Sequence, residues 1–360
     1  MQENKGKEKS EGKNENAPIR VGITVGDING IGPEVIIKAL RNSEILVDCT
    51  PIIYASSKLM SFHKKLIEDE LFVFQGISDA SQAQDKKINI VQSWTDIADI
   101  QIGKATEIGG RYAFYSLEKA TQDLASGKID VLVTAPISKE TIHMAGFMFP
   151  GHTEYLADLS GQKEALMMMV SGDLRVALVT SHIPLKDVIA EVKQDKVFAK
   201  ISELNKSLKK DFGVVRPRIA VLGLNPHAGE KGAMGTEESE QISPAIQKAM
   251  GEGILAFGPY PSDGFFGSRE YTKFDGVLAM YHDQGLTGFK SLAFDDGVNF
   301  TASLPIVRTS PDHGTAFNIA GKNEANEQSM RSAIYLALDV YRTRKWIKSI
   351  TENPLKPQTS

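Results

Sequence analysis

Residues 19–42 read IRVGITVGDINGIGPEVIIKALRN, and this stretch decides the expected fold. The apolar run IRVGITV predicts a buried strand, and GDINGIG predicts a glycine-rich turn. Pro33 is typical of the first position of a helix, which we expect over residues 33–42. The strand, turn and helix predict an ordered α/β unit that begins at Ile19.

The same alternation continues along the chain. Short apolar runs predict further strands at residues 51–56, 129–134, 165–170, 174–180, 218–224 and 277–281. Amphipathic segments between them predict helices at 57–69, 111–126, 137–145, 152–161, 184–192 and 237–251. Strands that alternate with helices predict an α/β fold with a mostly parallel sheet covered by helices. At 360 residues the chain is long enough for one large domain or two smaller ones.

Composition points to small molecules or like subunits as partners. The formal net charge is −4 and basic residues are dispersed, so we expect neither nucleic-acid binding nor a membrane-binding surface. No apolar run is long enough for a membrane span. Cys49 is the only cysteine, which excludes an internal disulfide and favours the cytoplasm. Residues 1–17 are rich in Lys, Glu, Asn and Gly, and we expect a disordered tail there.

Three of the seven histidines follow predicted strands: His182 after LRVALVTS, His227 after RIAVLGLNP and His282 after DGVLAMY. In an open α/β sheet, ligands bind just beyond the carboxyl ends of the strands. Three imidazoles at such ends predict a divalent metal site of the catalytic kind. The expected metal is zinc or cobalt rather than magnesium, because imidazole suits those two metals better. His63 and His143 lie in helical patterns and are expected to be surface or packing residues.

Familiar nucleotide and nucleophile motifs are missing. The GDINGIG turn does not complete GxGxxG, and neither a P-loop nor a GxSxG elbow occurs. Lys290 and Arg308 supply cations of the kind that hold phosphate and carboxylate groups, and Asn299 lies between them in the sequence. His152 and Thr153 open a predicted helix, whose N-terminus attracts anions. These residues predict a site for a small phosphorylated acid.

Several stretches together resemble one family, the 4-hydroxythreonine-4-phosphate dehydrogenases of pyridoxal phosphate biosynthesis. They are GDINGIGPE, GHTEYLA, RVALVTSHIPL, LNPHAGE, GTEE, MYHDQGL, GVNFTASLP and RTSPDHGTAFNIAG, and they span Gly26 to Gly321. The resemblance implies two α/β/α domains with the active site in the cleft between them, as in isopropylmalate dehydrogenase. We expect residues 18–140 plus 295–350 to form the first domain and 141–294 the second. The resemblance also implies a homodimer whose metal site draws ligands from both subunits.

The same resemblance implies roles for individual residues. His182, His227 and His282 match the metal ligands of the family, and the substrate contacts are matched by His152, Thr153, Lys290, Asn299 and Arg308. The wider resemblance to isocitrate and isopropylmalate dehydrogenases implies that the loop from His313 to Lys322 holds the adenosine of NAD. Its contacts would be His313, Gly314, Thr315, Ala316 and Asn318.

The cofactor loop departs from those wider relatives at one position. Asn318 replaces an aspartate whose charge would repel the 2′-phosphate of NADP, so we expect weak discrimination against NADP. Further departures at Ala233, Gly264 and Thr287-Gly288 border the expected substrate pocket. They leave the identity of the substrate more open than the reaction.

The implied reaction is metal-dependent oxidation of 4-phosphohydroxy-L-threonine, followed by loss of carbon dioxide. The metal would be zinc, with magnesium or cobalt as alternatives. The general base stays open between Asp263, Asp283 and a proton transfer assisted by Lys290. D-Threonate or D-erythronate 4-phosphate is the alternative substrate. A zinc-dependent hydrolase and a non-catalytic phosphometabolite-binding protein are the alternatives from other classes.

Overall fold

A computed structural model describes residues 17–41, 44–96, 99–162 and 165–352. The tail expected at residues 1–17 lies outside the described residues except for Ala17. Within these ranges, no helix combines the length and apolarity that a membrane crossing needs.

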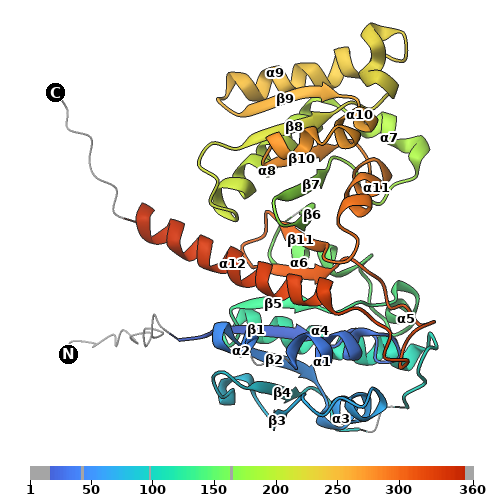
Figure 1. Ribbon diagram of the computed structural model, residues 1–360, viewed down its shortest axis with the longest axis vertical. Helices are drawn as coiled ribbons and strands as arrows, with labels where there is room; N and C mark the ends of the chain where they lie inside the picture. Colours follow the sequence, from blue (N-terminus) through green and yellow to red (C-terminus); the bar gives the residue numbers. More distant parts are fainter. Residues whose placement is uncertain (1–16, 42–43, 97–98, 163–164, 353–360) are drawn as a thin grey trace, which may run out of the picture.

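The centre of the molecule is one twelve-stranded sheet in the order β3-β4-β2-β1-β5-β12-β11-β6-β7-β10-β8-β9 (Figure 1). Its strands are β1 (Ile19–Thr24), β2 (Cys49–Ala55), β3 (Phe74–Ile77), β4 (Ile88–Gln92), β5 (Val131–Thr134), β6 (Leu166–Ser171), β7 (Leu174–Leu178), β8 (Arg218–Leu222), β9 (Leu255–Tyr260), β10 (Gly276–Ala279), β11 (Val298–Ala302) and β12 (Arg308–Pro311).

The sheet consists of two parallel wings with an antiparallel centre. From β3 to β12 all neighbours are parallel, and so are β7, β10, β8 and β9. Between the wings, β11 runs antiparallel to β12 and to β6, and β6 runs antiparallel to β7. The mostly parallel sheet predicted from the sequence is therefore confirmed. The chain returns to the first wing through β11 and β12, late in the sequence.

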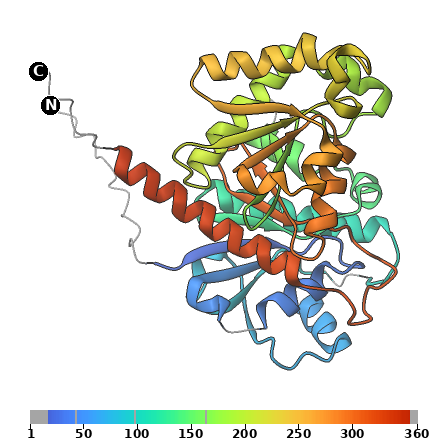
Figure 2. The ribbon, with the colours of Figure 1, turned by 45° about the horizontal axis from the view of Figure 1, so that its top comes forward.

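Helices cover both faces of the sheet (Figures 1 and 2). They are α1 (Gly32–Leu40), α2 (Ile45–Asp48), α3 (Ser57–Leu66), α4 (Glu107–Ala125), α5 (Lys139–Met144), α6 (His152–Leu159), α7 (Leu185–Glu191), α8 (Gln194–Lys210), α9 (Ser243–Gly251), α10 (Ser262–Gly267), α11 (His282–Leu292) and α12 (Gln328–Thr351). The long α12 packs on β5, β11 and β12 and so spans the centre of the sheet.

The core is continuous on one face and divided on the other. Alternate residues of a strand point to opposite faces, and on β2 Ile53 joins the large core while Ile52 joins a separate one. The large core includes residues of α1, α3, α8, α9 and α12 from both wings. The opposite face carries one core under α4, α5 and α6 and another under α10 and α11. The expected domain boundaries remain a prediction.

The strand-turn-helix unit of residues 19–42 forms as predicted over its described part, with two differences. Helix α1 begins at Gly32, so Pro33 is its second residue, and it ends at Leu40. Gly26 has a φ of +69°, and a Cβ there would lie 2.3 Å from the carbonyl oxygen of Pro136. The turn thus needs glycine because it packs directly against the backbone that follows β5.

Candidate active site

The structure contains a pocket of about 320 Å³. It is lined by residues from the ends of β5 and β12, from β11 and from the starts of α5 and α6: Thr134, Ala135, Pro136, Ile137, Lys139, Gly151, His152, Thr153, Glu154, His182, Lys290, Asn299, Arg308, Ser310, Pro311, Asp312, His313 and Gly314. All five residues expected to bind substrate are among them. The structure therefore brings together side chains that are far apart in the sequence.

Arg308 is the buried cation of this pocket, with 3% of its surface exposed. Its Nη2 donates to the Thr134 hydroxyl at 2.7 Å, and its Nη1 donates to the Thr301 hydroxyl at 3.0 Å. Both partners are neutral, and Glu154 acts on the guanidinium only through space. Burial lowers the pKa of Arg308 to about 10, so the group stays charged at neutral pH. A buried cation with neutral partners favours an anionic ligand.

Unpaired buried atoms surround this cation. His152 Nε2, Asn299 Oδ1 and His313 Nε2 are buried and have no hydrogen-bond partner within the described chain. Burial, reinforced by Arg308, holds the pKa of His152 well below its usual range. Burial also lowers the pKa of His313. Because buried polar atoms are normally paired, these three atoms fit a polar ligand. His313 is also the first residue of the expected cofactor loop, so it connects that loop to the pocket.

Lys290 and Asp312 form an ion pair at the edge of the pocket. Nζ of Lys290 lies 3.3 Å from Oδ2 of Asp312 and 3.5 Å from the backbone oxygen of the same residue. Burial raises the pKa of Asp312, although Lys290 opposes the shift. Sequence reasoning missed Asp312, even though it lies inside the quoted stretch RTSPDHG beside His313. The pair can hold and exchange a proton next to a bound substrate.

Two of the three strand-end histidines lie close together. β7, β10 and β8 are neighbours in the sheet, and His182, His282 and His227 follow their carboxyl ends, as the sequence predicted. The rings of His182 and His282 are 6.0 Å apart between centroids. Asp283 Oδ1 lies 2.7 Å from Nδ1 of His282, which leaves Nε2 of that ring free to bind a metal.

His227 does not join that pair. It begins a run of five residues with positive φ, from His227 to Lys231. The buried carboxylate of Glu238 accepts the backbone N–H groups of Leu224 and Asn225, both at 2.7 Å, and so anchors the chain just before this run. Within the described residues, no three His, Cys, Asp or Glu side chains form a group that could hold a metal ion. The structure thus supplies two adjacent imidazoles, and the third ligand stays a prediction.

Gln284 links the loops that carry two of these histidines. Its Nε2 donates to the backbone oxygen of Gly223 at 2.6 Å, and its Oε1 accepts the N–H of Met280 at 2.7 Å. Thr180 donates through its hydroxyl to the oxygen of Met280 at 2.7 Å. The strand ends that precede His182, His227 and His282 are therefore joined by side chains, although the ring of His227 lies apart from the other two.

The remaining candidates lie outside the pocket. Thr315, Ala316 and Asn318 continue the loop from His313, and Asn318 is exposed. Asp263 is exposed on α10 and does not line the pocket. Asp283 is also exposed and lies beside His282, in a depression that contains His182 as well. Its contact with His282 favours an orienting role over that of a general base. His63 is buried and His143 is exposed, in agreement with the packing and surface roles expected for them.

Comparison with known proteins identifies the family. Residues 47–337 match the family described as pyridoxal phosphate biosynthetic protein PdxA. The chain belongs to the PdxA family. A relative from Bacteroides thetaiotaomicron named 4-hydroxythreonine-4-phosphate dehydrogenase is 48% identical over 341 residues, which cover 94% of this chain and 93% of the relative. Relatives of this name make the chain an oxidoreductase of that family.

Other PdxA relatives extend the comparison. One from Cupriavidus necator is named D-threonate 4-phosphate dehydrogenase and is 40% identical over 317 residues, covering 87% of this chain and 95% of the relative. The crystal structure of a 4-hydroxythreonine-4-phosphate dehydrogenase from Klebsiella pneumoniae superposes with a TM-score of 0.78 at 34% identity. It covers 91% of this chain and 99% of that structure. The expected α/β fold with a large, mostly parallel sheet is confirmed.

Proposed function

We propose that this PdxA-family chain oxidises 4-phosphohydroxy-L-threonine with NAD to 2-amino-3-oxo-4-phosphooxybutanoate. The product loses carbon dioxide to give 3-amino-2-oxopropyl phosphate, a step towards pyridoxine 5′-phosphate. The observation that carries the proposal is the buried Arg308 guanidinium, whose described hydrogen-bond partners are the two threonine hydroxyls and His152. A doubly charged phosphate or a carboxylate would neutralise it.

The residues of the pocket divide the work of binding and proton transfer. Arg308 and the buried imidazole of His152 bind one charged end of the substrate, together with Thr153 at the start of α6. Asn299 offers its unpaired amide oxygen to a hydroxyl or amine of the substrate. The carboxylate of Asp312 accepts the proton that the substrate hydroxyl releases, while the ammonium of Lys290, paired with Asp312, donates to the substrate. These contacts hold the reacting carbon in one orientation, which is a large part of catalysis.

A divalent cation would be held by His182 and His282, with His227 as the third ligand. Imidazole ligands favour zinc, and cobalt or magnesium are the alternatives. The cation would polarise the oxygen of the substrate hydroxyl group that the reaction oxidises. The neighbouring rings of His182 and His282 support this assignment. The loop that contains His313, Gly314, Thr315, Ala316 and Asn318 would bind NAD or NADP, and the unpaired Nε2 of His313 supports it. When bound there, the cofactor would supply the hydride acceptor for the oxidation.

The assembly proposed is a homodimer with shared active sites, working in the cytoplasm. The resemblance that gives the site residues also implies ligands from both subunits. Exposed apolar side chains beside the His182 depression, Leu185 and Ile189 on α7, are consistent with a covered surface there.

A second substrate remains a candidate because the Cupriavidus necator relative is named for D-threonate 4-phosphate. D-Erythronate 4-phosphate belongs to the same class. These esters keep the phosphate and the carboxylate but lack the amino group, so they would use the same Arg308 and Lys290 contacts. The amino group alone separates the two functions.

The test is NADH formation by the purified, zinc-supplemented protein with each of the three phosphate esters. Turnover with 4-phosphohydroxy-L-threonine in the wild type, and loss of at least a hundredfold in Lys290→Met, would support the proposal. Turnover with D-threonate or D-erythronate 4-phosphate alone would assign the enzyme to sugar-acid catabolism. Phosphate release without NAD would contradict the oxidoreductase assignment of the pocket.

A further inference from the structure

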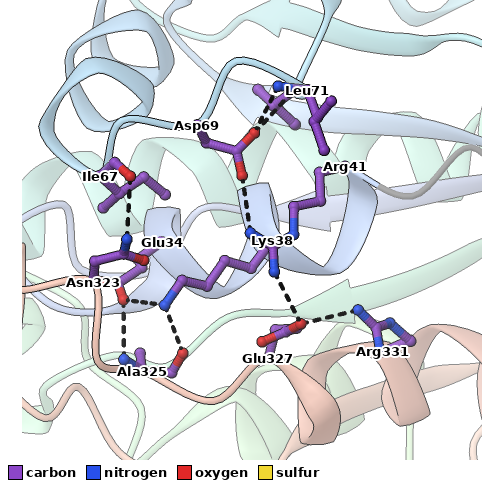
Figure 3. A network of polar contacts seen from close by, with 11 residues as sticks. Glu34, Lys38, Arg41, Ile67, Asp69, Leu71, Asn323, Ala325, Glu327 and Arg331 are labelled. Atoms are coloured by element: carbon purple, nitrogen blue, oxygen red, sulfur yellow. Dashed lines mark hydrogen bonds and ion pairs between the residues drawn. The ribbon is translucent and has the colours of Figure 1, made fainter.

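A buried ion pair on α1 clamps the chain just after the expected cofactor loop. Glu34 and Lys38 lie one helical turn apart with Oε1 and Nζ separated by 2.8 Å, and their exposed fractions are 1% and 6% (Figure 3). The same Oε1 accepts the N–H of Ala325 at 3.0 Å, and Nζ of Lys38 donates to the Ala325 oxygen at 2.9 Å. Both backbone groups of one residue are therefore held by the pair.

The turn before α1 holds the other end of the same loop. The N–H of Ile31 donates to the oxygen of Thr315 at 3.0 Å. Gly30 approaches so closely that a Cβ there would lie 2.8 Å from the same oxygen. The segment from Thr315 to Ala325 is thus held at one end by the turn before α1 and at the other end by α1, whose residues are all buried.

Further polar contacts reinforce the clamp. Asn323 has a φ of +60° and donates through Nδ2 to the oxygen of Ile67 at 3.3 Å. Arg41 joins Asp69 on one side and Glu327 on the other, and Glu327 also pairs with Arg331 (Figure 3). The polar network therefore continues from α1 past Ala325 into α12.

A buried ion pair contributes little to the stability of a fold, because the cost of removing both charges from water offsets their mutual attraction. An apolar pair would fill the same space, and Oε2 of Glu34 is buried without a partner among the described residues. What an apolar pair cannot do is bind the N–H and the oxygen of Ala325 together. The geometry thus suits orientation of the loop better than stabilisation of the fold.

We propose that Glu34 and Lys38 are positioning residues that hold the loop from His313 to Ala325 in the shape that binds the dinucleotide. Cofactor affinity therefore depends on this pair, although neither side chain lines the pocket. The inference rests on the cofactor assignment of that loop made under the proposed function.

The test compares ligand affinities rather than activity. The double variant Glu34→Gln with Lys38→Met removes both charges at similar volume. The introduced amide can still accept the Ala325 N–H, whereas the introduced thioether cannot donate to the Ala325 oxygen. We expect the Kd for NADH, measured by calorimetry, to rise at least tenfold. The stabilisation of the variant by millimolar inorganic phosphate, which reports on the Arg308 pocket, should match that of the wild type.

Two controls separate positioning from general damage. Lys200→Met removes another buried lysine, one that pairs with Glu203 at 3.0 Å within α8, and should leave the Kd for NADH unchanged. Lys38→Arg keeps a cation that can reach Glu34 and Ala325, and it should retain most of the affinity. If the double variant does not fold, Asn323→Ala releases the same segment at an exposed position, and a threefold rise in Kd is expected.

The outcomes are distinct. A double variant that binds NADH as tightly as the wild type overturns the inference, as does an unchanged Kd in a folded Asn323→Ala. An equal loss of phosphate and NADH binding also overturns it, because a specific clamp on the loop would spare the pocket. A wild type that binds neither NADH nor NADPH would instead contradict the cofactor assignment itself.

Discussion

Nη2 of Arg308 and Nδ1 of His152 lie 3.4 Å apart inside the pocket. Within the described chain, no carboxylate is hydrogen-bonded to either the guanidinium or the imidazole. The arrangement is stable only while His152 is neutral, and burial together with Arg308 lowers the pKa of His152 accordingly. Two nitrogen-rich side chains placed together in this way form a receptor for an anion rather than an ion pair of the fold.

Arg308→Lys should lower kcat/KM at least a hundredfold with the preferred phosphate ester. A lysine keeps the charge but cannot bind Thr134, Thr301 and an anion together as a planar guanidinium does. The measurement is steady-state kinetics with circular dichroism to check folding. Arg344→Lys is the matched control, because Arg344 pairs with the buried Asp211 away from the pocket. Equal losses in both variants would contradict an anion-binding role.

Asp283→Ala should weaken zinc binding about 10- to 100-fold, the usual effect of losing a carboxylate that orients a metal-binding histidine. The reason is the 2.7 Å contact between Asp283 and Nδ1 of His282. Competition with a chromogenic chelator measures the affinity of the apoprotein directly. Asp263→Ala, an exposed change on α10, should bind zinc like the wild type. Unchanged zinc affinity in Asp283→Ala would mean that the aspartate does not orient the ring.

Asn318→Asp should raise the preference for NAD over NADP about tenfold or more, because a carboxylate repels the 2′-phosphate. In the wild type we expect the ratio of kcat/KM for the two cofactors to stay below a hundred. Both ratios come from initial rates at saturating substrate. The control is Asn326→Asp, at a residue outside the loop whose Oδ1 accepts the N–H of Gln328 at the start of α12. A wild-type preference above a hundredfold would show that Asn318 does not relax the selectivity.

We expect the buried imidazole of His63 to lower the stability of the fold in mild acid. Its Nε2 lies 3.0 Å from the oxygen of Ile28, and burial lowers the pKa of His63 to about 4, whereas an unfolded histidine titrates near 6.5. Between these values the unfolded chain binds more protons, so stability falls as the pH falls from 6.5 towards 4.

The matched variant is His63→Gln, whose amide can donate to the same oxygen without titrating. The free energy of unfolding of the wild type, relative to this variant, should drop by about 2 kcal/mol between pH 7 and pH 4.5. Urea denaturation at both pH values measures it. His143→Gln, on the exposed face of α5, should follow the wild type. A constant difference between wild type and His63→Gln would mean that the buried ring is protonated in the fold.

Local patterns predicted most of the helices and strands but not the elements that complete the sheet. The strands predicted at 129–134 and 218–224 form as β5 and β8. The strands β3, β4 and β9 went unpredicted. So did the late strands β11 and β12, because VNFTA and RTSP are short and carry polar residues. Helices α8 and α12 also went unpredicted, although the buried apolar residues of α8, Val197, Ile201, Leu204 and Leu208, recur at helical spacing.

The α/β class, the glycine turn and the residue types of the site could be predicted from the sequence alone, because these depend on local periodicity and on side-chain chemistry. The burial of Arg308 among neutral partners and the pairing of Asp312 with Lys290 depend on the tertiary structure. The tertiary structure also determines that His182 and His282 meet while His227 is turned into a left-handed run. The reason is that burial and pairing depend on which distant strands become neighbours. The return of β11 and β12 to the first wing sets the neighbours of Arg308, and no local pattern encodes it.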